Sequence, residues 1–131
     1  MAPDVLKIII DQLSETTGVW VADVLPPAGD LAGELPCVRV DELPGTSKLI
    51  PWQITGDVEL QELGIDIDVL GASRYETREL RERIHQVMMR LPATITAVTR
   101  VQAAATFHTR PDLNPGIRRV GAEYLVTART E

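Results

Sequence analysis

The feature that most constrains the fold of this chain is a long amphipathic helix predicted in its second half. The stretch SRYE at 73–76 has the form of a capping box, in which Ser73 accepts a hydrogen bond from the backbone N–H of Glu76 and the Glu76 side chain reaches back. Pro92 is expected to end the helix. Apolar residues between them recur at helical spacing: Leu80, Ile84, Val87, Met88 and Leu91. A helix with one apolar face needs an apolar surface to cover.

A second amphipathic helix is predicted at the start of the chain. Pro3 suits the first helical turn, Asp4 favours the positive end of the helix dipole, and Gly18 is a natural stop. The apolar stripe of this helix consists of Val5, Leu6, Ile9, Ile10 and Leu13. Both helices therefore need an apolar surface to cover, and a sheet with one apolar face provides it.

Alternating patterns predict the strands of that sheet. The clearest strand is 57–71, in which one face is apolar and the other carries Asp66 and Asp68. The apolar face consists of Leu63, Ile65, Ile67 and Val69. Val58 and Leu60 are in the opposite phase, so a bulge is expected nearby, at Gln61 and Glu62.

Four further strands are predicted, at 19–25, 35–43, 96–109 and 117–129. They are separated by a Pro- and Gly-rich loop at 26–33, a long breaker-rich connection at 44–56 and a turn at 110–116. The order is α-β-β-β-α-β-β. The sequence therefore predicts one domain over 1–131, an α+β two-layer sandwich with an antiparallel or mixed sheet covered by two helices.

Composition and charge exclude several classes of protein. The 131 residues, 44% hydrophobic and 24% charged, suit one globular domain with a single core. The net charge of −6 argues against a domain that grips nucleic acid through its phosphates. Cys37, the one cysteine, is predicted to be an unreactive residue of the core or sheet. No apolar run approaches the ~20 residues of a membrane span.

The N-terminus is charged and amphipathic and does not have the pattern of a signal peptide. The protein is therefore expected to act inside the cell that makes it, or in a particle assembled there.

The sequence contains no Gly-rich phosphate loop, nucleophile elbow, HExxH or paired CxxC motif. His85, predicted on the wet side of the long helix, and His108, near a loop, do not make a metal site without a third ligand. Asp66 and Asp68 have the spacing of an acid–base pair, but the favoured interpretation is a face that contacts solvent or a neighbouring subunit. The sequence therefore predicts a non-enzyme, with no catalytic residue, cofactor or metal.

Apolar residues within the breaker-rich connection are the most unusual feature of the chain. They are Leu49, Ile50 and Trp52. One interpretation is that they fold back on the core. The other is that they are held for a partner and become ordered on docking, with Trp52 as an anchor.

The layout resembles the tail terminator of lambda-like siphophages, and four stretches carry the resemblance over nearly the whole chain. They are LPCVRV, a Pro-led strand before a long loop; WQITGDVELQELGIDIDVLG, a Trp followed by a strand that runs into the second helix; ETRELRERIHQVMMRLP, that helix; and FHTRPDLNPGIRRVGAEYLVTA, an aspartate-containing turn before the last strand. The loop at 26–33 departs from the family pattern.

The resemblance implies a homohexameric ring at the head-proximal end of the tail, within the virion, after assembly in the host cytoplasm. The ring would stop polymerisation of the major tail tube protein and offer a surface to the head-completion (stopper) protein. DNA would pass through its lumen without sequence-specific binding. The family's tube-facing loop corresponds to 44–56, so the implied tube contacts are Lys48, Leu49, Ile50 and Trp52. Subunit contacts are expected on the second helix, through Arg74, Arg78 and Glu82.

Other classes of protein stay open at this point. Another head–tail connector component would tend to be a smaller β-barrel, which the two predicted helices disfavour. A small α+β enzyme or ligand-binding domain would need a pocket with converging polar groups, and the sequence offers no such cluster. A host-side oligomeric adaptor is a third alternative.

Overall fold

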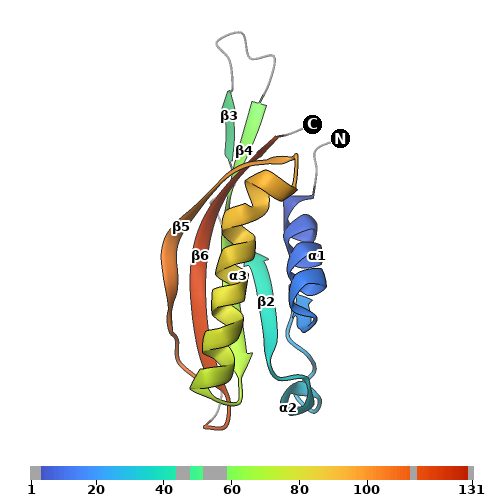
Figure 1. Ribbon diagram of the computed structural model, residues 1–131, viewed down its shortest axis with the longest axis vertical. Coiled ribbons are helices and arrows are strands. Elements are labelled where there is room, and N and C mark those ends of the chain that lie inside the picture. The colour runs from blue at the N-terminus through green and yellow to red at the C-terminus, as the bar shows by residue number, and fades with distance from the viewer. Residues whose placement is uncertain (1–3, 44–47, 52–58, 113–114, 130–131) are drawn as a thin grey trace.

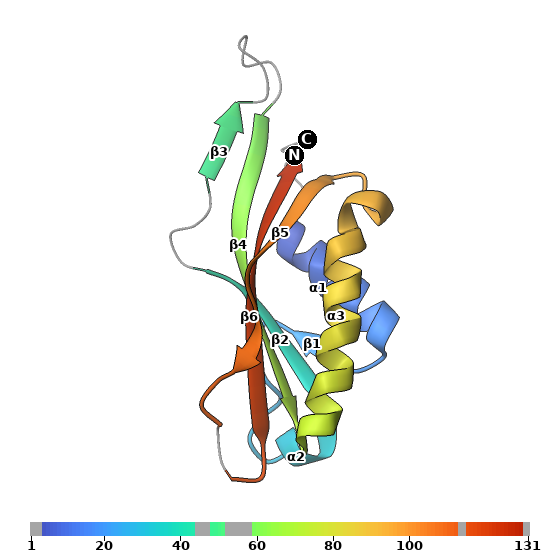
Figure 2. The ribbon, with the colours of Figure 1, turned by 60° about the vertical axis from the view of Figure 1, so that its left-hand side comes forward.

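The computed structural model describes residues 4–43, 48–51, 59–112 and 115–129, which form a two-layer α+β sandwich (Figure 1). The elements are α1 (Val5–Thr17), β1 (Trp20–Ala22), α2 (Leu31–Glu34), β2 (Cys37–Glu42), β3 (Lys48–Pro51), β4 (Glu59–Gly71), α3 (Arg74–Thr94), β5 (Val98–Thr109) and β6 (Arg118–Arg129). Helices α1 and α3 lie on the same face of the sheet (Figure 2). The predicted fold class is confirmed, and α2 and β3 are added to the predicted order.

The sheet has six strands in the order β1-β2-β4-β6-β5, with β3 paired to β4 beside this path. It is mixed, because β1 is parallel to β2 while the other pairs are antiparallel. The pairing of β4 with β6 runs from Leu60 to Gly71 without a shift in register, so the predicted bulge at Gln61 and Glu62 is wrong. Leu60 faces away from the main core and is buried where β3 pairs beside it.

The main core lies between the two long helices and the covered face of the sheet. Its buried residues come from both predicted helical stripes and from alternate positions of the strands: Val5, Ile9 and Leu13 of α1, Leu80, Ile84, Met88 and Leu91 of α3, and Ile65, Ile67, Val69, Val120, Ala122, Tyr124 and Val126 of β4 and β6. The apolar periodicity thus predicted the covered faces correctly. No helix in the described part of the chain is long and apolar enough to span a membrane.

The helix ends follow their capping residues. The Asp4 carboxylate accepts from the backbone N–H of Lys7, and Gly18 ends α1 with φ +72°, a left-handed conformation that favours glycine. Ser73 accepts from the N–H of Glu76 at 3.2 Å, as predicted. The Glu76 carboxylate reaches back one residue further than expected and accepts from the N–H of Ala72 at 3.1 Å.

Pro92 does not end α3, which continues to Thr94. A proline removes one N–H from the helical ladder but leaves its neighbours able to bond. The N–H of Ile95 still donates to the carbonyl of Leu91 at 2.8 Å, and Leu91 is fully buried in the core. Packing of this last turn therefore outweighs the local cost of the proline.

Two loop predictions change in the structure. Strand β1 ends at Ala22, earlier than the predicted 19–25, and the indole N–H of Trp20 donates to the carbonyl of Val24 at 3.3 Å. Within the predicted connection 44–56, residues 48–51 form β3, antiparallel to β4. The other residues of that connection lie outside the described ranges.

The Pro- and Gly-rich segment covers a second, smaller apolar cluster. Leu25, Leu31 and Leu35 pack against a buried group made of Cys37, Leu70 and Ile117. Burial, with a smaller effect from the nearby Glu34 carboxylate, raises the pKa of the Cys37 thiol to about 11. The thiol is therefore protonated at neutral pH, which fits its predicted role as a core residue.

Two adjacent methionines of α3 test the assigned core. Met88 is fully buried and Met89 is 44% exposed. Met88→Ala is expected to lower the free energy of unfolding by about 2–5 kcal/mol, because it removes packed atoms and leaves a cavity. Met89→Ala, the control, should change it by less than about 0.5 kcal/mol. Urea denaturation followed by circular dichroism measures both, and equal effects would contradict the placement of α3.

Candidate interaction surfaces

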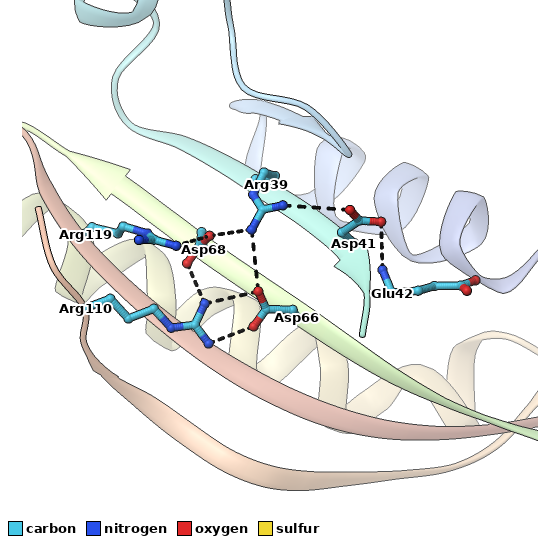
Figure 3. A network of polar contacts seen from close by, with 7 residues as sticks. All are labelled: Arg39, Asp41, Glu42, Asp66, Asp68, Arg110 and Arg119. Atoms are coloured by element: carbon cyan, nitrogen blue, oxygen red, sulfur yellow. Dashed lines mark hydrogen bonds and ion pairs between the residues drawn. The ribbon is translucent and has the colours of Figure 1, made fainter. Parts of the chain in front are cut away.

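The face of the sheet opposite the long helices carries a buried carboxylate bound by three arginines (Figure 3). Asp68 of β4 is 2% exposed. Its Oδ2 accepts from Nη2 of Arg39 and from Nη2 of Arg119, each at 2.9 Å, and its Oδ1 accepts from Nη1 of Arg110 at 2.6 Å. The three guanidinium groups come from β2, from β6 and from the residue after β5. We call these residues, with Asp66, the open-face network.

Arg110 joins both aspartates of β4. Its guanidinium donates to Asp66 at 2.7 and 3.2 Å while holding Asp68 with the same Nη1 atom. The group lies against Gly121 of β6, and a methyl group at that position would collide with it. Glycine at 121 therefore provides the space in which the guanidinium reaches both carboxylates.

The predicted solvated or subunit-facing surface at Asp66 and Asp68 is corrected for Asp68, which is enclosed by guanidinium groups of its own chain. Burial by itself raises the pKa of the Asp68 carboxyl, but the hydrogen bonds from Arg119, Arg39 and Arg110 outweigh it and hold the pKa below its usual value. An acid–base residue needs a pKa near the working pH. The arrangement instead suits a structural role, in which a charged Asp68 holds the three arginines in place.

The two histidines occupy different environments. His85 is half-buried, not on the wet side of the helix, and its Nδ1 lies 2.8 Å from the Tyr124 hydroxyl. Tyr124 is fully buried, so its hydroxyl needs a partner, and burial raises its pKa to about 12. His108 is exposed near the end of β5, as predicted. Within the described ranges, no three His, Cys, Asp or Glu side chains gather to hold a metal ion.

A cavity of about 640 Å³ lies between the first turns of α3 and the ends of β5 and β6. We call it the arginine pocket, because its lining includes five arginines and one aspartate: Arg74, Arg78, Arg81, Arg118, Arg119 and Asp112. Tyr75, Thr77, Thr109 and Val120 complete the wall. In a chain of net charge −6, the lining of this pocket is a local concentration of positive charge.

Most of the positive charge in the pocket is weakly paired. Arg78 lies 3.7 Å from Glu82, and Arg118 lies 3.5 Å from Asp112. Arg74 and Arg81 form no ion pair with any described residue. Surface pairs at such distances contribute little to stability, so these side chains are available to a partner.

The residues predicted as contacts fall into two separate places. Arg74 and Arg78 line the arginine pocket, and Glu82 follows one turn further along α3. Lys48, Leu49 and Ile50 lie in β3, at the opposite end of the molecule from the start of α3 (Figure 1). Trp52 lies outside the described residues.

Sequence reasoning missed Arg81, Arg118 and Arg119 as pocket residues, and it missed Arg39 and Arg110 of the open-face network. A signal existed for Arg39, because it alternates with buried valines in β2 as Asp66 and Asp68 do in β4. The remaining arginines are brought together only by the pairing of β5 with β6 and by the position of α3.

No family model matches this sequence, and a comparison with curated proteins finds no match. In structure, the chain is similar to a chain from the virion of a native gene transfer agent (GTA) particle, with a TM-score of 0.58 and 13% sequence identity. The likeness covers 92% of this chain and 91% of the other. At this identity the likeness shows a shared fold over nearly the full length of both chains.

The open-face network predicts an acid-sensitive contribution to stability. Asp68→Asn is expected to lower the free energy of unfolding at pH 7 by about 2–3 kcal/mol, because three guanidinium groups lose a charged acceptor. Removing one partner from a wholly buried ion pair would cost more, about 3–5 kcal/mol. The smaller value is expected here because the three arginine side chains are 15–29% exposed and can be partly solvated.

The pH dependence has a definite sign. Since the folded pKa of Asp68 is depressed, its stabilisation is present above the unfolded pKa of about 4 and is lost as the pH falls through the folded pKa. Urea denaturation at pH 7 and pH 3 should therefore show a smaller acid loss in Asp68→Asn than in the wild type. Asp41→Asn, at a carboxylate whose side chain is 48% exposed and lies 3.8 Å from Arg39, is the control and should have little effect.

Proposed function

We propose that this protein is a structural subunit of a phage-like virion, a tail terminator that forms a homohexameric ring on the head-proximal end of the tail tube. The observation that carries the coarser part of the proposal, a structural role in a virion, is the likeness over nearly the full length to a chain of a gene transfer agent virion. The finer part, a tail terminator, is supported by the resemblance of the sequence to siphophage tail terminators in the order and spacing of its elements. The proposal is non-enzymatic, because the ring would act by occupying the growing end of the tube.

The shape of the subunit suits a ring component with separate contacts at its two ends. Strand β3 and the start of β4 project beyond the helical layer, while the first turns of α3 lie at the other end of the sheet (Figures 1 and 2). Those first turns line the arginine pocket. A ring subunit must contact its neighbours and also the components above and below it. Two surfaces at opposite ends of one rigid sheet permit both kinds of contact at once.

The projecting hairpin is the proposed contact with the major tail tube protein. Strand β3 pairs with β4 through only four residues, from Lys48 to Pro51. Its other edge is free of the strands in the described part of the chain, and a free strand edge offers unpaired backbone groups to a partner. Leu49 and Ile50 would supply apolar contacts there, with Lys48 beside them and Trp52 as an anchor.

The surface of α3 that carries Arg74, Arg78 and Glu82 is the proposed contact between subunits. In a closed ring one patch of each subunit meets a different patch of the next. The opposite face of the ring would receive the head-completion protein, and DNA would pass through the lumen without sequence-specific contacts.

Tail length in particles tests the proposed function. The double variant Trp52→Ala, Leu49→Ala is expected to produce abnormally long or headless tails, because the ring would no longer hold the growing end of the tube. Electron microscopy of lysates from a phage that carries the variant measures tail length directly. Met89→Ala, an exposed substitution on α3, is the control and should give normal particles. Tails of unaltered length in the double variant would contradict the proposal that the hairpin contacts the tail tube.

A further inference from the structure

Charge is divided unevenly along this chain. Residues 8–38 contain five carboxylates and no lysine or arginine. Residues 74–129 contain ten of the thirteen basic residues, against five carboxylates. The two segments belong to different parts of the fold, since the first builds most of α1, β1 and α2 and the second builds α3, β5 and β6. The subunit is therefore acidic on one side and basic on the other.

The two sides correspond to opposite edges of the sheet. Strand β1 is one edge and β5 is the other. The segment that follows β1, residues 23–34, carries the exposed carboxylates Asp23, Asp30 and Glu34, and none of them forms an ion pair with a described residue. Toward the other edge, the arginine pocket lies between α3 and the strands β5 and β6, and its Arg74 and Arg81 likewise form no ion pair with a described residue.

Helix α2 and the first turns of α3 lie at the same end of the molecule (Figure 1). The pocket is lined by those first turns of α3, by the end of β5 and by the start of β6, so the pocket and the acidic segment are at that same end. In a ring of identical subunits joined head to tail, one edge of each copy faces the opposite edge of the next. Where the long axes of the subunits are parallel to the ring axis, features at the same height on opposite edges meet across every subunit boundary.

We propose that the arginine pocket of one copy receives the acidic segment 23–34 of the adjacent copy, and that this contact closes the ring. The inference rests on the proposed function and deepens it by naming both sides of the subunit contact. Asp30, the N-cap of the short helix α2, and Glu34, its last residue, approach Arg74 and Arg81 of the neighbour. The Pro- and Gly-rich segment, which departs from the resembled family, thereby acquires a role in assembly.

Charge reversal on both sides tests this contact. The pocket variant is Arg74→Glu with Arg81→Glu, and the segment variant is Asp30→Arg with Glu34→Arg. Each alone is expected to weaken assembly by about tenfold or more, because like charges would meet at every boundary. Mixed in equal amounts, the two variants should assemble again, since copies that alternate around an even-numbered ring restore an opposite-charge contact at each boundary.

Light scattering at several concentrations measures assembly in solution, and electron microscopy measures it on isolated tail tubes, so a ring that forms only on the tube is also detected. Arg90→Glu with Arg100→Glu is the matched control, because it makes the same change in net charge at exposed arginines outside the pocket. All variants are first compared by thermal unfolding to show that they fold. Assembly of the control should match the wild type.

The outcomes separate this inference from the proposed function. Restored assembly in the mixture supports the contact. If the wild type assembles but the mixture does not, or if the control loses as much as the pocket variant, the contact is overturned and the ring stands. Binding to heparin, a polyanion, is a further measurement. If the pocket variant loses heparin binding and its mixture with the segment variant does not assemble, the pocket is assigned to a polyanion and the proposed contact is overturned. A wild type that assembles neither in solution nor on tubes would remove the proposed function and this contact together.

Discussion

The register of the sheet depends on the pairing of the buried Asp68 carboxylate with three arginines. A sheet covered by helices on one face only would ordinarily leave solvated polar residues on the other. Here a carboxylate that is 2% exposed must be matched by guanidinium groups from three directions at once. A slip of β4 by one residue would turn Asp68 toward α3 and expose its apolar neighbours. The apolar core and the open-face network therefore specify the same register from opposite faces.

The sequence predicted well which face of each helix and strand is buried in the core. The stripe of α3 and the alternation in β4 and β6 repeat at the period of their own element, so local pattern suffices. Strand β3 has no such pattern, since it exists through pairing with the far end of β4. The extension of α3 past Pro92 likewise depends on the burial of Leu91, which a local rule for proline does not weigh.

The candidate site was predicted only in part, for a related reason. Arg74 and Arg78 were expected at a contact because the second helix of the resembled family suggested it, and both line the arginine pocket. Arg118 and Arg119 reach the pocket from β6, which depends on the return of the chain after β5. Arg119 also donates to Asp68, so one wall of the pocket is held by the open-face network. A pocket wall fixed before docking loses less conformational entropy when a partner binds.

The division of charge also bears on which kind of oligomer this chain can form. With a net charge of −6, copies repel one another at long range, so association needs local complementarity. A twofold contact centred on the arginine pocket would place Arg74 and Arg81 of one copy against the same residues of the other, which like-charge repulsion disfavours. A head-to-tail contact instead sets the basic edge of one copy against the acidic edge of the next. Because such a contact leaves one free edge at each end of any open chain of copies, it is satisfied everywhere only when the chain closes into a ring.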